Sequence, residues 1–236
     1  MGLTKPTDVL VLWDIDHTLI ETRGVGRAAF AAAFEQVTGV ALRGMPTVTG
    51  RTEPDIYRAA SALHGLSNPP PFETFASALT TAYAVRRHDL ERTGRRLPGA
   101  ADALAHLASN SRLYQSVLTG NPRDVAKIKL ETFGLEEYLD LSVGAYGDDD
   151  SHRPTLVSIA RSRASRQYAT SFDDTNTVLI GDSPGDISTA AEGGAHIVAV
   201  AAGGTPPNEL TGADFILPAL TDHELLERAV LSLVGP

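Results

Sequence analysis

The fold of this chain is decided by one stretch, Val9-Leu10-Val11-Leu12-Trp13-Asp14-Ile15-Asp16-His17-Thr18. Its continuous apolar run is typical of a strand buried on both faces in a parallel sheet. Side chains at positions i and i+2 of a strand point to the same side, so we expect Asp14 and Asp16 to lie together where the strand ends. Adjacent carboxylates repel each other unless a cation or a shared proton relieves the repulsion. The alternative is a strand end with acidic turn residues and an Asx-type bond to Thr18.

Composition limits the classes of protein that the chain can represent. It has 236 residues, 42% of them hydrophobic, which is enough for one domain with an insertion or for two small domains. It has no cysteine, so disulfides and thiolate metal sites are excluded. The net charge of −9 argues against a nucleic-acid partner. No apolar run approaches the ~20 residues of a membrane span, and residues 1–8 lack the features of a signal peptide. We therefore expect a soluble cytoplasmic protein with no membrane partner.

Residues 21–96 carry helical patterns. Apolar residues recur at helical spacing from Phe30 to Val37, from Ile56 to Leu63 and from Phe75 to Ala82, and no strand-like run is visible from about Glu21 to Arg96. These patterns predict a small all-helical block.

From residue 97 onward, strand patterns alternate with helical ones. The predicted strands are Leu113–Leu118, Leu141–Ala145, Thr177–Ile180, His196–Val200 and Phe215–Leu217. Such alternation predicts an α/β fold, a doubly wound parallel sheet with a Rossmann-like core. Residues 1–20 and 97–236 would form this core, and residues 21–96 a helical cap inserted at the edge where such sheets bind ligands.

Polar residues follow the predicted strands and should converge on that edge. They are Asp14, Asp16, Thr119, Arg153, Asp182 and Asp186. Oxygen ligands of this kind suit Mg²⁺, which binds a few carboxylates and keeps positions for water and a phosphate oxygen. The sequence therefore predicts a magnesium site.

These residues also occur in a familiar order. The chain resembles the haloacid dehalogenase superfamily, in its phosphatase branch, and within it the phosphoglycolate-phosphatase-like group with a helical cap after the first strand. The four matching segments are Asp14-Ile15-Asp16-His17-Thr18 (Asp-x-Asp-x-Thr), Leu118-Thr119-Gly120-Asn121, Arg153-Pro154, and Gly181-Asp182-Ser183-Pro184-Gly185-Asp186 (Gly-Asp-x-x-x-Asp). Each motif alone is weak, but all four in order are specific.

The resemblance implies a Mg²⁺-dependent phosphatase for a small phosphorylated metabolite. Asp14 would attack phosphorus to give an aspartyl phosphate, and Asp16 would act as general acid and base. The implied metal contacts are Asp14, the Asp16 carbonyl, Asp182 and, directly or through water, Asp186. The implied phosphate contacts are Thr119, the amides of Gly120 and Asn121, and Arg153.

Some positions depart from the family pattern or stay open. His17 stands where the family usually has Gly, and Arg153 stands where it usually has Lys. Lys127 and Lys129 could fill the basic role instead, although we interpret both as a solvated helix face. Arg51, at a predicted helix start in the cap, could bind a second anionic group of the substrate, or it is a solvated arginine.

Two other functions remain compatible with these motifs. A phosphotransferase such as a sugar phosphomutase would keep the same residues but exclude water. A catalytically idle regulatory protein would keep only the fold. We expect a monomer or a weak homodimer.

Overall fold

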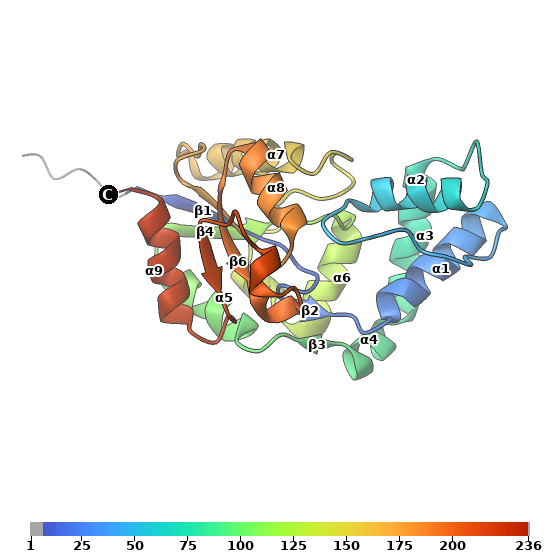
Figure 1. Cartoon of the computed structure of the whole chain (residues 1–236), viewed down its shortest axis with the longest axis horizontal. Coiled ribbons are helices and arrows are strands. Elements are labelled where there is room, and N and C mark those ends of the chain that lie inside the picture. Colours follow the sequence, from blue (N-terminus) through green and yellow to red (C-terminus); the bar gives the residue numbers. More distant parts are fainter. Residues whose placement is uncertain (1–6, 236) are drawn as a thin grey trace, which may run out of the picture.

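The structure, a computed structural model, describes residues 7–235, so the first six residues of the predicted core lie outside the described part. A five-stranded parallel sheet forms the core, with strand order β4-β1-β5-β6-β7. The strands are β1 (Val9–Trp13), β4 (Leu113–Val117), β5 (Thr177–Gly181), β6 (His196–Val200) and β7 (Phe215–Leu217). This arrangement confirms the predicted doubly wound α/β fold (Figure 1).

Strand β1 is buried on both faces because it lies between β4 and β5. Val11 and Trp13 pack toward one face and Leu10 and Leu12 toward the other, as the period of two in a strand requires. The first face is covered by α5 (Ala100–Ala108), α6 (Arg123–Phe133) and α9 (His223–Leu233), and the second by α7 (Thr155–Tyr168) and α8 (Pro184–Gly193). The continuous apolar run of the sequence thus packs against two layers of helices, one on each face of the sheet.

The strand predicted at residues 141–145 is wrong. Only an isolated bridge between Leu118 and Ala145 forms there. The Asp140 carboxylate accepts hydrogen bonds from the Ser142 amide (2.9 Å) and hydroxyl (2.6 Å), which holds the chain in a turn.

Three short helical turns complete the fold: η1 (Glu136–Tyr138), η2 (Ala201–Gly203) and η3 (Pro207–Glu209). Over residues 7–235, every helix is too short or too polar to cross a membrane.

The cap consists of α1 (Val25–Thr38), α2 (Glu53–Leu63), α3 (Phe72–Val85) and α4 (Arg87–Thr93). Its own core is aromatic: the Phe75 ring lies 4.9 Å from that of Phe30 and 4.3 Å from that of Tyr57. Two short strands, β2 (Ile20–Glu21) and β3 (Arg95–Arg96), pair antiparallel where the chain enters and leaves the cap. They correct the expectation of no strand between Glu21 and Arg96, and they lie at the predicted boundaries.

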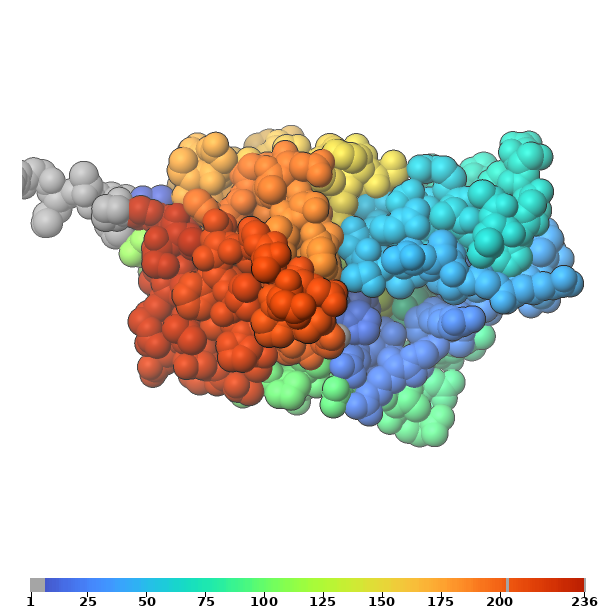
Figure 2. All heavy atoms as spheres, viewed as in Figure 1, coloured from blue at the N-terminus to red at the C-terminus, as the bar shows by residue number. Residues whose placement is uncertain are grey.

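The cap is packed against the core (Figure 2). Cap residues share a pocket with Asp14, Thr119 and Asp182, which follow the C-terminal ends of β1, β4 and β5. The loop before α2 meets the start of α8 so closely that a Cβ added to Gly185 would overlap the Cα of Gly50. The amide of Glu53 donates a hydrogen bond to the carbonyl of Gly120 in the core (2.8 Å). Backbone therefore touches backbone across the two parts, which only glycine permits at the first contact.

Gly185→Ala should prevent this docking, because the new methyl group would collide with Gly50. The chain has no cysteine, so thiol-reactive spin labels would attach only at two introduced cysteines, Val85→Cys in the cap and Arg166→Cys in the core, both at exposed positions. We expect the interlabel distance distribution to shift to longer values and to broaden. Gly235→Ala, where a Cβ meets open space, is the control. An unchanged distribution in Gly185→Ala would show that the glycine contact does not control docking.

Candidate active site

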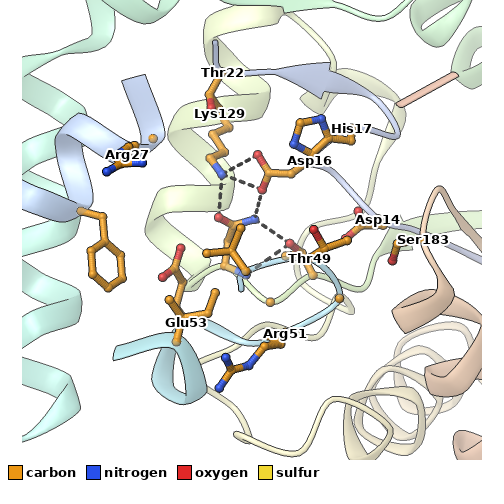
Figure 3. Close-up of a pocket in the computed structure, with 18 of the residues that line it drawn as sticks. Asp14, Asp16, His17, Thr22, Arg27, Thr49, Arg51, Glu53, Lys129 and Ser183 are labelled. Carbon is orange, nitrogen blue, oxygen red and sulfur yellow. Dashed lines mark hydrogen bonds and ion pairs between the residues drawn. The ribbon is translucent and has the colours of Figure 1, made fainter. Parts of the chain in front are cut away.

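The ends of β1, β4 and β5 open into a pocket of about 310 Å³ between core and cap (Figure 3). Asp14 and Asp16 follow β1, Thr119 follows β4, and Asp182 follows β5, because parallel strands bring their carboxyl ends to one edge. The cap contributes the opposite wall, which includes Phe30, Arg51, Glu53, Ile56 and Tyr83. The structure thus brings five of the residues expected at the sheet edge into one pocket: Asp14, Asp16, Thr119, Arg153 and Asp182.

Three carboxylates form a tight group at this edge of the sheet. Asp14, Asp182 and Asp186 each place an oxygen within 4.8 Å of the others, and all three residues are buried. Burial and then the Asp186 charge raise the pKa of Asp14 well above its ordinary value, and the same two causes raise the pKa of Asp182 to about 7. Such crowding is relieved by a hard divalent cation with oxygen ligands. The donor set therefore fits Mg²⁺, whereas the expected contact of the Asp16 carbonyl stays a prediction.

Arg153 lies beside the predicted nucleophile. Its Nη2 donates to Asp14 Oδ1 (2.8 Å) and to Asp186 Oδ1 (2.6 Å). The other oxygen of Asp186 accepts bonds from the amide (3.0 Å) and hydroxyl (2.6 Å) of Ser183 and so caps α8. In the described chain, the buried Nε of Arg153 has no hydrogen-bond partner. A buried donor without an acceptor is unusual and indicates a missing partner.

Lys129 is part of the site, which the sequence interpretation missed. Its Nζ donates to Oδ1 (2.8 Å) and Oδ2 (2.7 Å) of Asp16 and to Oδ1 of Asn121 (2.7 Å), and it lies 5.2 Å from the centre of the Tyr83 ring. Burial alone would raise the pKa of Asp16, but Lys129 and Asn121 together hold it below its ordinary value. The solvated face predicted for both lysines is correct for Lys127, whose side chain is 60% exposed, and wrong for Lys129, at 3%.

A signal for Lys129 was present in the sequence. It follows Val125 by four positions and Ala126 by three, and these two residues with Leu130 form the buried face of α6. A lysine on the apolar face of an amphipathic helix needs a buried partner, and Asp16 is that partner.

Asn121 connects the remaining polar groups. Its Nδ2 donates to Asp16 Oδ2 and to the hydroxyl oxygen of Thr119, both at 2.7 Å. The Thr18 hydroxyl donates to Asp182 Oδ1 (3.2 Å), so the Asx-type alternative considered for the end of β1 is replaced by a link between strands. Thr119 and Asp16 are thus held in fixed positions at the floor of the pocket.

His17 is exposed and has a φ of 65°, while its amide donates to the carbonyl of Ile20 (2.7 Å). The left-handed conformation explains why glycine is favoured at this position.

Arg51 lines the pocket, but its guanidinium is already bound. Nε donates to Asp55 Oδ2 (2.6 Å), Nη1 to the carbonyl of Thr47 (2.9 Å), and Nη2 to the carbonyl of Asp55 (3.2 Å). A second anionic group would have to compete with Asp55, so the substrate contact expected for Arg51 stays a prediction.

Comparison with known proteins agrees with this geometry. The model of the haloacid dehalogenase-like hydrolase family matches residues 11–191. The chain belongs to this family. No curated protein matches the sequence.

Several solved structures share the fold of this hydrolase. CbbY from Rhodobacter sphaeroides in complex with phosphate is 21% identical, with a TM-score of 0.69, and the match covers 92% of this chain and 96% of CbbY. A hydrolase from Pseudomonas syringae is also 21% identical (TM-score 0.68; 94% and 99% covered). A predicted phosphoglycolate phosphatase from Haemophilus somnus is 16% identical (TM-score 0.64; 96% and 100% covered).

Lys129→Ala should destabilise the protein because it leaves the Asp16 carboxylate without its cation. Losing one partner of a fully buried pair costs about 3–5 kcal/mol, and since the Asp16 side chain is 33% exposed we expect about 2 kcal/mol. Thermal unfolding would then shift down by roughly 4–8 °C. Lys127→Ala is the matched control and should shift it little. Equal effects of the two variants would contradict the burial argument.

Proposed function

We propose that this hydrolase is a Mg²⁺-dependent phosphatase that acts on a small phosphorylated metabolite through an aspartyl phosphate on Asp14. The observation that carries the proposal is the position of Asp14: it is buried among carboxylates that fit a divalent cation, and Arg153 lies 2.8 Å away with a further donor free. A carboxylate that attacks a dianionic phosphate needs positive charge around it, because the two anions otherwise repel each other. Arg153 and a bound divalent cation would supply that charge.

The carboxylates of the site divide the chemistry between them. Bound Mg²⁺ would be held by Asp14, Asp182 and Asp186 and would supply charge compensation and orientation for the phosphate. Asp14 attacks phosphorus, and the ester bond to the leaving oxygen breaks. Thr119 and Arg153 hold the transferring oxygens.

Asp16 handles the protons of both steps. An incoming phosphate dianion raises the pKa of Asp16 against the effect of Lys129, so that Asp16 can take up a proton from solvent and then give it to the leaving oxygen. Lys129 then favours the ionised form of Asp16, which takes a proton from the water that attacks the aspartyl phosphate. Asn121 and Lys129 keep the carboxylate in place throughout.

The docked cap supports a small substrate, because a pocket of about 310 Å³ under a lid leaves no room for a folded protein. A lid also excludes bulk water and strengthens the electrostatics of the site. A cytoplasmic location and a monomeric or weakly dimeric state stay predictions from the sequence.

Purified protein should release inorganic phosphate from 4-nitrophenyl phosphate or from members of a panel of phosphorylated metabolites when Mg²⁺ is present. Chelator should abolish the release and added Mg²⁺ restore it. Asp14→Asn should reduce release to background, because an amide is no nucleophile here. Full activity in chelator would refute the metal site. Transfer of the phosphoryl group to another position or to a second substrate, without release of inorganic phosphate, would identify a phosphotransferase.

Arg153→Ala should lower kcat by about 10²- to 10³-fold, the usual effect of losing one donor to the transferring oxygens. Arg153→Lys should recover part of this loss, because it keeps the charge but not the fork of donors. Arg166→Ala, on the exposed side of α7, is the control. Steady-state kinetics that show no loss for Arg153→Ala would remove this residue from the phosphate site.

A further inference from the structure

The cap side of the pocket contains a buried carboxyl group that the proposed chemistry does not use. Glu53 is the first residue of α2, and its backbone amide is fixed to the carbonyl of Gly120 (2.8 Å). Its Oε2 atom is buried and, within the described chain, accepts no hydrogen bond. Figure 3 shows the side chain rising from α2 toward Lys129 and the floor of the pocket. A buried carboxyl oxygen without a donor is unusual and indicates a missing partner.

The neighbouring cations cannot supply that partner. Lys129 has three N–H donors, and Asp16 and Asn121 accept all three. Arg51 is bound to Asp55. Burial therefore raises the pKa of Glu53 to about 7, although the charge of Lys129 acts in the opposite direction. Glu53 lines the same pocket as Asp14, Asp16 and Lys129.

The walls around Glu53 define what can lie there. Phe30, Ile56 and Tyr83 from three cap helices make this part of the pocket largely apolar. A leaving group in this space would place its carbon skeleton against the aromatic side chains. It would also need one hydrogen-bond donor for Glu53, and a second phosphate or a carboxylate there would meet a carboxyl group whose neighbouring cation, Lys129, is already paired with Asp16.

We propose that Glu53 accepts a hydrogen bond from a hydroxyl group of the leaving group, so that the pocket selects phosphate monoesters of neutral polyols or sugars over esters that carry a second anionic group. This inference rests on the proposed phosphatase function, and it differs from the contact expected for Arg51. Glu53 would then act as a specificity residue of the cap.

Matched substrates test the proposal. Glycerol 3-phosphate and 3-phosphoglycerate share a three-carbon skeleton and differ at one end, which is a hydroxymethyl group in the first and a carboxylate in the second. Glucose 6-phosphate and 6-phosphogluconate form the corresponding six-carbon pair, with a neutral end and a carboxylate end. Propyl phosphate lacks both groups. In wild-type protein with Mg²⁺, kcat/KM for at least one neutral polyol or sugar ester should exceed that of its carboxylate partner and of propyl phosphate by about tenfold or more.

Two variants separate the hydrogen bond from the charge. Glu53→Ala should reduce the preference for the hydroxylated ester over propyl phosphate by about 10- to 100-fold, because the acceptor is lost. Glu53→Gln keeps an acceptor and loses the charge, so it should reduce mainly the discrimination against the carboxylate partner. Glu35→Gln, an exposed carboxyl of α1, is the matched control and should change neither ratio.

Two outcomes overturn the inference. If both Glu53 variants change every substrate by one common factor, Glu53 has only a structural role. If wild-type protein prefers the carboxylate partners and Arg27→Ala abolishes that preference, the distal contact belongs to Arg27, an exposed cation of α1 that lines the same pocket.

Binding measurements separate this inference from the proposed function. Calorimetric titration of the Asp14→Asn variant needs no turnover. If wild-type protein releases no phosphate from any ester, the proposed function is wrong. The inference still holds if Asp14→Asn binds the neutral ester more tightly than its carboxylate partner and if adding Glu53→Ala removes this difference. Equal binding of both esters to Asp14→Asn overturns the inference itself.

Discussion

The mutual repulsion of carboxylates at one edge of the sheet is the constraint on which this structure depends. Asp14, Asp182 and Asp186 are buried within a few ångströms of one another, and Asp16 lies in the same pocket. A parallel sheet brings such residues together, and burial makes their charges costly. The fold is organised so that this cost is offset by cations.

Two buried cations provide that compensation. Arg153, in the turn before α7, pairs with Asp14 and Asp186, while Lys129, in α6, pairs with Asp16. The sequence presented these two residues as alternatives for a single basic role, whereas each of them pairs with a carboxylate of the site. Each pair also ties a helix to the end of β1.

The same pairing links the core to the cap. Lys129 lies over the ring of Tyr83 in α3, and Val125, one turn earlier in α6, belongs to the apolar core of the cap. The buried face of helix α6 thus contacts both the cap and Asp16. The docking of the cap and the placement of Asp16 therefore depend on the same helix.

Much of the fold followed from pattern, because the apolar run of β1 and the alternation after residue 97 have strong periods. The residues at strand ends could be placed together because topology alone brings them to one edge. Three features do not follow from hydrophobic periodicity and topology. Lys129 reads as an exposed residue unless its helical face is considered; the turn at Asp140 depends on a local side-chain bond; and a glutamate at a helix start, such as Glu53, is explained by the helix dipole alone.

The central claim is that Asp14 itself receives the phosphoryl group. The most direct measurement is mass spectrometry of peptides from protein that is quenched in acid during turnover with Mg²⁺ and a hydrolysed ester. The account predicts one phosphoryl group on the peptide that contains Asp14, fragmentation that assigns it to Asp14, and none in the Asp14→Asn variant. A phosphoryl group on another residue, or turnover by Asp14→Asn at the wild-type rate, would contradict it.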